Sequence, residues 1–522
     1  MRPPGWPRQA DCSSGDLPMF RPPSRRRTLY RDSCRLLVVA IPVSTIVLLI
    51  VYSRLGVNSL FRPSPQPLPP SYTKGSKPDT RQLLASSLST FLSHNQDLAS
   101  RHWAPVSISA CEPGTPSFFA PCLAQRREGA LFGEELVYPD FRLREPVFAQ
   151  SRSENAGEWR KLLPDIRGRA AWCEESGWVC YRGQTGQNIV LANATYTGVP
   201  ADEWSDQACM GGDVSTAGLR TAPGHARVNT LETAAEYNEA FPIDNLLVAA
   251  SPDSWSFQHF LDRVTHVVSQ AAHLNLSHAT PDVVLDARPR PVVAGMWEML
   301  GFGGEKMHYY AGAPIAAKNI VFSCRSPLIH PWLSLRTLEM FGLDPVGIPL
   351  ERRRKIVYIS RSHGDMLNYG RRVLNEDELL PDIRALLVER GQGEDLVLFH
   401  ELGLTSPREL MFWFHENVRA VVGPHGGGLY NHRWAGKDTL VLEMMPATHT
   451  SHMFWEEASV LGQTYANILL PPSSPGSKDM YADIPAVLDI LREHLGKPDP
   501  RGPTVEPAYR WRAAELFEDG RR

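Results

Sequence analysis

The chain has no marked excess of charge of either sign, no C-x-x-C cysteine pair, and no internal repeat beyond a coarse doubling of strand–helix units. Its 54 lysines and arginines nearly balance 57 aspartates and glutamates, which leaves a formal net charge of −3. Without a dense basic patch, the sequence predicts no nucleic-acid partner. Without a C-x-x-C pair, a structural zinc site has no ligand spacing to support it.

One long run of apolar and small residues is present, Leu36–Tyr52. Its seventeen residues are close to the minimum that spans a bilayer. Six arginines lie between positions 21 and 35, whereas only Arg54 and Arg62 follow the run closely. This asymmetry predicts a cytoplasmic N-terminus and an uncleaved type II anchor over residues 36–53. A cleaved signal peptide is the alternative, but no small-residue cleavage pattern follows the run.

The flanks of the predicted anchor have the composition of unfolded chain. Residues 1–35 are rich in proline and arginine and are predicted to form a cytoplasmic tail. Residues 54–105 are predicted to form a stem, because the segment Arg62–Lys77 contains five prolines and favours a stiff, extended chain. The remaining residues, 106–522, are too many for one hydrophobic core, so we expect two domains.

The cysteines divide between the two predicted compartments. Cys12 and Cys34 fall on the cytoplasmic side and are expected to be free thiols. An even number falls on the lumenal side and allows up to three disulfides: Cys111, Cys122, Cys173, Cys180, Cys209 and Cys324. Cys173 and Cys180 are close enough in the chain for a local bridge. Two N-glycosylation sequons also lie on that side, at Asn193 and Asn275.

The glycine-rich segment Gly423–Asn431 (G-P-H-G-G-G-L-Y-N) is the most informative part of the sequence. It lies between the apolar residues of 418–422 and of Thr439–Met444, both predicted to be buried strands. Consecutive glycines after a strand expose backbone N–H groups to an anion, and His425 adds a side-chain donor. The pattern predicts a phosphate-bearing ligand at the carboxyl end of a parallel strand. A tight turn without a ligand is the alternative.

Strands and helices alternate over about residues 355–446. Lys355–Arg361 and Leu396–Glu401 are predicted strands, and Arg371–Glu376 leads into a helix. The next helix is predicted to begin at Ser406–Glu409 (S-P-R-E), with serine as N-cap, proline at the first position and glutamate closing a capping box. This alternation is typical of a parallel sheet wound with helices.

The preceding part of the chain shows the same alternation more weakly. The predicted strands are Asp244–Ala250, Pro281–Arg288 and Asn319–Ser323, and the predicted helices are Ser254–Gln270 and Val292–Leu300. On the first helix, four polar side chains recur at α-helical spacing: His259, Asp262, Arg263 and His266. They form either a solvated polar face or a cleft-facing site with an acid–base group.

Four segments in this order and spacing resemble glycosyltransferase family 61: I-S-R (359–361), R-R-V-L-N-E (371–376), G-P-H-G-G-G-L-Y-N (423–431) and V-L-E-M-M-P (441–446). That family includes plant xylosyl- and arabinosyltransferases and the animal EGF-domain O-GlcNAc transferase. The resemblance is strong over about 355–470, weaker over 245–345, and not visible in the first 100 residues.

The match also has departures. S-F-Q-H-F (256–260) fits the family pattern N-x-x-H-(F/W) at His259 and Phe260, but Ser256 replaces the usual asparagine. Gly427 and Gly428 stand where many members carry Gly-Ala-Gly, and Asn431 also differs. The last two departures remove no backbone donor.

The resemblance implies an α/β, GT-B-like fold in which two Rossmann-like parallel-sheet lobes face a cleft. The expected parts are an acceptor-side lobe (106–345), a nucleotide-sugar-binding lobe (346–480) and a C-terminal helical extension (481–522). Anchor, stem and body together are the layout of a type II protein of the Golgi or ER membrane with a lumenal catalytic body. The implied activity is inverting transfer of xylose or GlcNAc from a UDP-sugar to a glycan or glycoprotein acceptor.

The chain has no Asp-x-Asp, the motif with which many GT-A enzymes hold a metal. We therefore expect no tightly bound cofactor, no requirement for a divalent metal, and a donor site built from fixed cations and amides. The candidate donor-site residues are Arg361, Arg371, Arg372, Asn375, Glu376, His425, Gly426, Gly427, Gly428, Leu429, Asn431 and Glu443. Asn375 and Glu376 are candidates for the base or ribose pocket. Glu443 either bonds the ribose or caps a buried network.

Inversion by a single displacement needs one general base, and the candidates are His259 and Asp262. His400, His415, His449 and His452 are expected to be structural, and Met444 and Met445 to lie in the core. A non-catalytic lumenal carbohydrate-binding or scaffold protein is the alternative function. The retained Arg361, His425 and glycines argue against it, because a degenerate site is expected to lose them.

Overall fold

The computed structural model describes residues 122–127, 131–161, 170–173, 176–196, 238–251, 254–272, 274, 280–285, 287–309, 313–344, 347–363 and 370–499. All of them belong to one compact unit, Pro78–Arg522. The predicted tail, anchor and stem lie outside the described residues, as do Cys111, Cys209 and Asn275. In the described ranges, no helix has both the length and the apolar character needed to cross a membrane.

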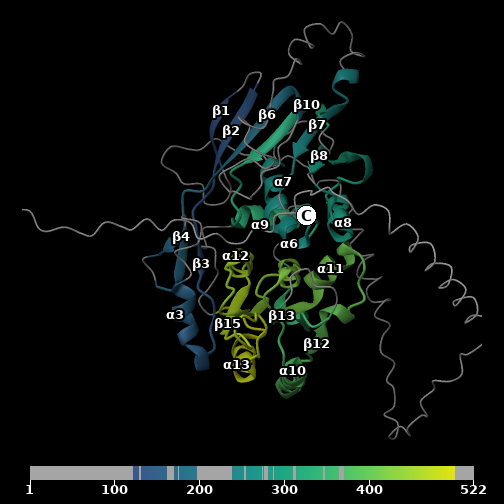
Figure 1. Ribbon diagram of the computed structural model, residues 1–522. Helices are drawn as coiled ribbons and strands as arrows, with labels where there is room; N and C mark the ends of the chain where they lie inside the picture. The colour runs from purple at the N-terminus through teal and green to yellow at the C-terminus, as the bar shows by residue number, and fades with distance from the viewer. Residues whose placement is uncertain are drawn as a thin grey trace, which may run out of the picture. The chain divides into compact units, whose positions relative to one another are not determined.

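The carboxyl-terminal sheet has five strands, all parallel, in the order β12-β11-β13-β14-β15. Figure 1 labels β12, β13 and β15 of this sheet. Its strands are β11 (Lys355–Tyr358), β12 (Asp395–Leu398), β13 (Val418–Pro424), β14 (Leu440–Pro446) and β15 (Thr464–Leu470). The apolar runs that the sequence singled out supply β11, β12, β13 and β14, and the predicted parallel sheet is confirmed here. Strand β15 was not predicted. Met444 and Met445 are buried in its core, as predicted.

Helices cover both faces of this sheet. They are α10 (Glu376–Arg390), α11 (Pro407–Asn417), the 3-10 helix η7 (Gly427–Trp434), α12 (Met453–Val460) and α13 (Ile484–His494). Apolar residues of α10 and α13 share one core cluster with one side of the strands, whereas α11, η7 and α12 pack into the other. The sheet is therefore doubly wound. Helix α11 begins at Pro407 as predicted, but the Ser406 side chain makes no capping hydrogen bond.

The preceding sheet has seven strands in the order β1-β2-β6-β10-β7-β8-β9. Its strands are β1 (Cys122–Arg127), β2 (Leu131–Val137), β6 (Thr185–Tyr196), β7 (Ile243–Val248), β8 (Asp282–Leu285), β9 (Met307–Tyr309) and β10 (Ile315–Cys324). Only β10, β7, β8 and β9 pair in parallel; β1, β2, β6 and β10 pair antiparallel. The prediction of a second parallel-sheet lobe was therefore wrong for half of this sheet. Residues 128–130 alone join β1 to β2, too few for the crossover that parallel strands need.

The helices that accompany this sheet are α6 (Phe257–His259), the π-helical turn η3 (Phe260–Val264), α7 (Thr265–Ala271), α8 (Pro291–Met299) and α9 (Pro331–Met340). The first three follow one another without a break, so the predicted helix over 254–270 is present but contains a π turn. Short 3-10 turns connect other elements: η1 (Gln150–Arg152), η4 (Gly304–Lys306), η5 (Leu350–Arg352) and η6 (Phe399–Glu401).

A small antiparallel sheet orders its strands β3-β5-β4, and α3 (Glu154–Lys161) lies between β3 and β4 in the chain. The strands are β3 (Phe141–Arg144), β4 (Ala170–Trp172) and β5 (Trp178–Tyr181). The predicted bridge between Cys173 and Cys180 is present, with Cα atoms 5.3 Å apart. Cys122 and Cys324 are also disulfide-bonded. Val147, just after β3, pairs with Ala466 of β15, so this early part of the chain packs on the carboxyl-terminal sheet.

Candidate active site

The strand order of the carboxyl-terminal sheet creates a switch point between β11 and β13. From β11 the chain runs outward to β12, then crosses back to β13 on the other side. In doubly wound sheets, ligands bind at the carboxyl ends of the two strands that flank such a point. Arg361 follows β11 and His425 follows β13. Two motifs that are far apart in the sequence therefore meet at the position where this fold binds ligands.

The glycine loop after β13 packs directly against the segment after β11. A Cβ atom on Gly423 would lie 2.7 Å from the carbonyl oxygen of Ile359, which no real side chain tolerates. A Cβ atom on Gly426 would lie 2.2 Å from Nη1 of Arg361. The glycine at 426 thus makes room for the Arg361 guanidinium.

The rest of the loop holds its own conformation. Leu429 is fully buried in the core. Asn431 donates from Nδ2 to the carbonyl oxygen of Gly428 at 2.8 Å. The contribution of both residues to the site is therefore through the shape of η7, whose first residues are Gly427 and Gly428.

Two arginines are buried side by side at the switch point. Arg361 donates from Nε to the carbonyl oxygen of Gly370 at 3.0 Å. Burial, and then the charge of Arg371, lower the pKa of Arg361 to about 10. Burial also lowers the pKa of Arg371. Because burial disfavours both charges, and the charge of Arg371 further disfavours that of Arg361, the pair is poised to gain from an anion.

Arg371 carries two further marks of a functional position. Its φ of 64° is left-handed, a conformation that costs a non-glycine residue about 1–3 kcal/mol. Its side chain is buried, yet its Nε has no hydrogen-bond partner among the described residues. A strained backbone and an unused buried donor together indicate that the guanidinium is held ready for a ligand.

The neighbouring arginine has a different role. The Nη2 atom of Arg372 pairs with Oδ2 of Asp479 at 2.6 Å, and the Arg372 side chain is 53% exposed. The Asp479 hydrogen bond raises the pKa of Arg372. Of the two arginines that the sequence offered, only Arg371 joins Arg361.

The side chains of Asn375 and Glu376 form hydrogen bonds within the protein. The amide of Asn375 bonds both the N–H and the carbonyl of Ala482, at 2.8 and 3.2 Å. Glu376 accepts hydrogen bonds from Tyr358 Oη at 2.9 Å and Ser360 Oγ at 2.7 Å. Glu376 therefore braces the segment that carries Arg361, whereas Asn375 holds the backbone at Ala482.

His425 heads a buried chain of hydrogen bonds. Its Nδ1 lies 2.5 Å from Oε1 of Glu443, which is completely buried. Tyr465 donates its hydroxyl to the other Glu443 oxygen, and Asn467 donates to Tyr465 at 3.1 Å. Burial, then the Glu443 charge, raise the pKa of Tyr465 well above its ordinary value, so it stays a donor. Of the two alternatives for Glu443, the structure supports the buried network.

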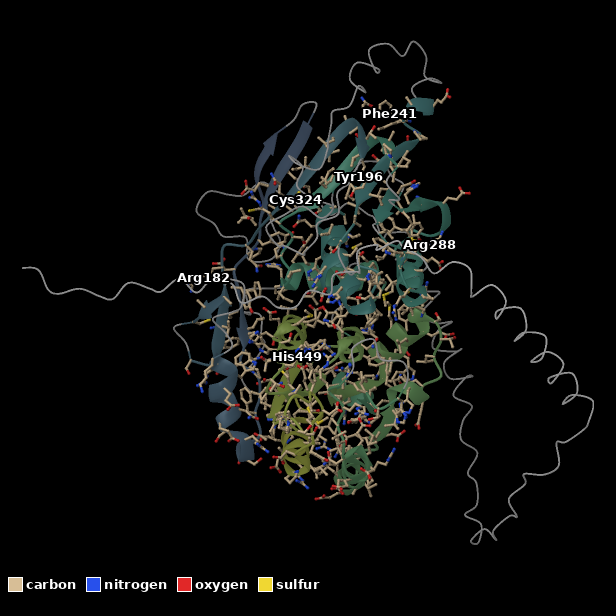
Figure 2. All side chains as sticks on the ribbon, in the orientation of Figure 1. Arg182, Tyr196, Phe241, Arg288, Cys324 and His449 are labelled. Atoms are coloured by element: carbon tan, nitrogen blue, oxygen red, sulfur yellow. A yellow bond between two sulfur atoms is a disulfide. The ribbon has the colours of Figure 1, made fainter. Side chains whose placement is uncertain are left out.

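His449, labelled in Figure 2, contacts residues of this site, although the sequence suggested a structural role for it. Its Nε2 is 3.5 Å from Nη1 of Arg371, and its ring centroid is 5.6 Å from that of His425. No local pattern in the sequence marks this histidine. By contrast, His415 is buried with Nδ1 3.2 Å from the carbonyl oxygen of Trp434, in keeping with the expected structural role.

The start of the helix 257–271 adjoins the glycine loop. A Cβ atom on Gly427 would lie 3.3 Å from Oε1 of Gln258. His259 follows, with Nδ1 3.5 Å from Oδ2 of Asp262, and their side chains are 29% and 5% exposed. Neither Asp262 oxygen has a hydrogen-bond partner among the described residues. A partly accessible imidazole thus stands in front of a buried carboxylate.

The prediction that His259, Asp262, Arg263 and His266 lie on one face of this helix is confirmed only in part. His266 is fully buried, with Nδ1 3.1 Å from the carbonyl oxygen of Pro327 and Nε2 3.4 Å from Oγ of Ser334. The π turn η3 takes more residues per turn than an α-helix, so it rotates His266 away from His259. The alternative of a solvated face is wrong for Asp262 as well, because Asp262 is also buried.

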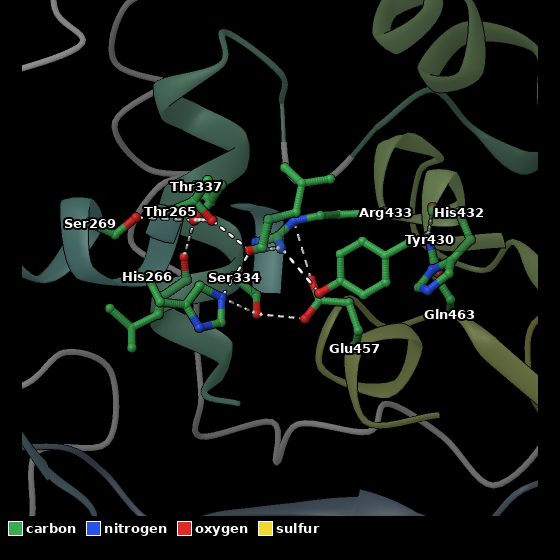
Figure 3. A network of polar contacts seen from close by, with 12 residues as sticks. Thr265, His266, Ser269, Ser334, Thr337, Tyr430, His432, Arg433, Glu457 and Gln463 are labelled. Carbon is green, nitrogen blue, oxygen red and sulfur yellow. Dashed lines mark hydrogen bonds and ion pairs between the residues drawn. The ribbon is translucent and has the colours of Figure 1, made fainter. Parts of the chain in front are cut away.

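A buried network of hydrogen bonds and ion pairs connects η7, the 3-10 helix of the glycine loop, to the π turn η3 (Figure 3). Arg433, in η7, donates from Nη1 to the carbonyl oxygen of Leu261 at 2.7 Å. Its Nε lies 3.3 Å from Oε1 of Glu457, whose other oxygen accepts from Ser334 Oγ at 3.1 Å. The sequence reasoning missed Arg433 and Glu457, because nothing local distinguishes a buried arginine or glutamate from an exposed one.

We expect the Arg433→Met variant to lose about 3–5 kcal/mol of unfolding free energy, because Glu457 is then buried without its cation. Burial already raises the pKa of Glu457 from 4.5. The unfolded chain therefore binds fewer protons at Glu457 than the folded protein does. The loss of unfolding free energy in Arg433→Met should then grow as pH rises above 4.5. Chemical denaturation at several pH values measures it.

Two controls test this reason. Arg492 pairs with Asp489 at the surface, where both side chains are about half exposed, so Arg492→Met should cost at most about 1 kcal/mol. The double variant Arg433→Met/Glu457→Gln should be more stable than Arg433→Met alone. A double variant less stable than the single would contradict the proposed uncompensated charge.

Among the described residues, no group of three or more His, Cys, Asp or Glu side chains could hold a metal ion. The site has instead two buried arginines, two histidines and a glycine loop. These are cation and amide donors of the kind that hold phosphate groups. The metal requirement stays a prediction.

Comparison with protein families agrees with this geometry. The model of the family described as Glycosyltransferase 61 matches residues 224–442, which span both the helix with His259 and the glycine loop. No curated protein matches the chain. The family match includes all four polar residues of the 259–266 helix and every candidate donor-site residue except Glu443. Residues 224–442 of the chain are therefore similar to glycosyltransferase family 61, the family that the sequence segments resemble.

Proposed function

We propose that this glycosyltransferase moves xylose or GlcNAc from a UDP-sugar to a glycan or glycoprotein acceptor, with inversion at the anomeric carbon. The observation that carries the proposal is the pair of buried arginines, Arg361 and Arg371, beside a glycine loop at the β11/β13 switch point. A diphosphate is the anion that suits two arginines and adjacent loop amides. The proposed arrangement is GT-B-like, with a donor-binding parallel sheet and a second, mixed-sheet lobe.

The reaction creates negative charge on the leaving diphosphate, which the arginines and His425 can stabilise. An acceptor hydroxyl oxygen forms a bond to the anomeric carbon while the bond from that carbon to the diphosphate oxygen breaks. The electron pair leaves with the diphosphate, where Arg361, Arg371 and His425 stabilise it. No covalent sugar–protein intermediate is needed for inversion.

The proton of the acceptor hydroxyl goes to His259 in this proposal. His259 is the more accessible member of its pair, and Asp262 lies behind its Nδ1 atom. A carboxylate in that position orients the imidazole and stabilises the imidazolium that forms. The 3.5 Å separation is long for a hydrogen bond, but such contacts commonly tighten when substrate binds.

The choice of sugar depends on a pocket that the arginines do not define. Xylose lacks the C6 hydroxymethyl group of GlcNAc, so one bulky side chain near C6 can select between them. We further propose that the protein is a single-pass type II protein of the Golgi or ER membrane. The proposal rests on Leu36–Tyr52 and the arginines before it.

Release of UDP by the purified full chain, measured over a panel of UDP-sugars with and without EDTA, tests the proposal. We expect release with one donor, retained in EDTA and abolished in Arg361→Ala. Arg372→Ala is the matched control, because its guanidinium is engaged by Asp479. If no donor is turned over and UDP does not raise the unfolding temperature, the non-catalytic alternative replaces this one.

A further inference from the structure

His449 is surrounded by positive charge. Arg361, Arg371, His425 and Lys478 all act on it electrostatically. Two acids are close by but engaged: Glu443 pairs with His425, and Asp479 pairs with Arg372. The backbone N–H of His449 donates to the carbonyl oxygen of Pro446 at 2.9 Å, which anchors the residue just after β14.

The contact with Arg371 determines which nitrogen of His449 carries the proton. A guanidinium has five N–H donors and no acceptor. The 3.5 Å approach of Arg371 Nη1 to His449 Nε2 therefore requires a lone pair on Nε2. The imidazole is then neutral, with its hydrogen on Nδ1. Burial and then the surrounding cations lower the pKa of His449 to about 4, in agreement with this geometry.

A bound anion changes both features that keep His449 neutral, namely the hydrogen bond from Arg371 and the surrounding positive charge. A bound diphosphate draws hydrogen bonds from Arg371, which releases the lone pair on His449 Nε2. Its negative charge also offsets the cations that disfavour a protonated imidazole. Both effects act in the same direction.

We propose that His449 takes up one proton at Nε2 when a nucleoside diphosphate binds, so that this histidine becomes an additional cation for the leaving group. The proton comes from solvent, one N–H bond forms, and no other bond changes. The inference rests on the proposed function, because it assumes that Arg361, Arg371 and His425 form the diphosphate site.

The sign of the pH dependence follows from linkage. The complex binds more protons than the free protein, so lower pH favours the complex. Over the pH range where uptake is complete, affinity for UDP should rise about tenfold for each unit of decrease. The terminal phosphate of UDP itself titrates at about pH 6, so the wild type must be compared with a variant that lacks the imidazole.

Isothermal titration calorimetry of UDP into the purified full chain measures the uptake. Binding enthalpies at about pH 6, in two buffers of different ionisation enthalpy, give the number of protons exchanged. We expect His449→Gln and His449→Asn each to take up about one proton fewer than the wild type when UDP binds. His400→Gln is the matched control: His400 is exposed, and its ring packs at a tilt against that of His363, with ring centroids 4.3 Å apart. It should match the wild type.

The outcomes separate the two proposals. Equal proton exchange in the wild type and in both folded His449 variants would overturn the role of His449 and leave the diphosphate site intact. Failure of the wild type to bind UDP would instead overturn the proposed function and this inference with it. Because glutamine and asparagine both accept a hydrogen bond from Arg371, either variant suffices if the other does not fold.

Discussion

In the His259→Gln variant, we expect turnover of sugar transfer to fall by about 10²–10⁴-fold, with little change in affinity for UDP. Glutamine keeps the polarity and approximate size of the side chain but cannot accept the acceptor proton. Initial rates with the preferred donor, together with UDP titrations, measure the two quantities. His308→Gln is a close control, because His308 is also 29% exposed and paired with an aspartate, Asp282, at 2.6 Å.

The Asp262→Asn variant distinguishes the two base candidates. If Asp262 only orients His259, this variant should keep part of the rate, and its pH profile should shift. Its unfolding midpoint should change little. Relief of a buried carboxylate that lacks hydrogen-bond partners among the described residues is offset by loss of the 3.5 Å ion pair between Asp262 Oδ1 and Arg263 Nε. Full loss of activity in Asp262→Asn, with activity retained in His259→Gln, would assign the base to Asp262 instead.

Replacement of Arg371 by alanine should lower kcat by about 10²–10³-fold, the loss typical when one donor to a developing oxyanion is removed. The reason is that a buried guanidinium with an unused Nε is lost from the proposed diphosphate site. Alanine, like arginine, adopts the left-handed φ of 64° at this position only at a cost in conformational free energy. Arg371→Gly removes the same charge without that cost, so the two variants should lose activity alike.

Arg372→Ala is the control for this prediction, and it differs by one position in the chain. Its partner Asp479 also accepts from the Arg372 backbone N–H at 2.9 Å, a bond that alanine retains. We expect Arg372→Ala to keep most of the wild-type rate. Equal losses at both positions would show that the loop, rather than the Arg371 guanidinium, supports catalysis.

The carboxyl-terminal sheet could be predicted from the sequence because its signals are local. Strands β13 and β14 are short apolar runs whose residues are all buried, and a proline marks the start of α11. The antiparallel half of the other sheet could not be predicted in this way. Its pairing of β6 with β10 joins residues more than a hundred positions apart, and no local pattern fixes strand direction.

In the candidate site, too, some residues could be predicted from local sequence signals and others could not. The glycine loop and Arg361 could be found because their residue types and spacing are unusual. The role of His449 depends on a contact with Arg371, 78 residues away in the chain, and could not be found from its neighbours. The π turn likewise has no local mark, and it is held in part by Arg433, 172 residues from Leu261.

The sequence by itself determined the family segments, the order of strands and helices around the glycine loop, and the set of basic residues available to it. These depend on residue type and short-range spacing, which the chain carries before it folds. Only the tertiary structure decided that Arg371 rather than Arg372 joins Arg361, that Glu443 is buried behind His425, and that His449 stands among the cations. Those outcomes depend on burial and side-chain direction, which arise only when distant segments pack together.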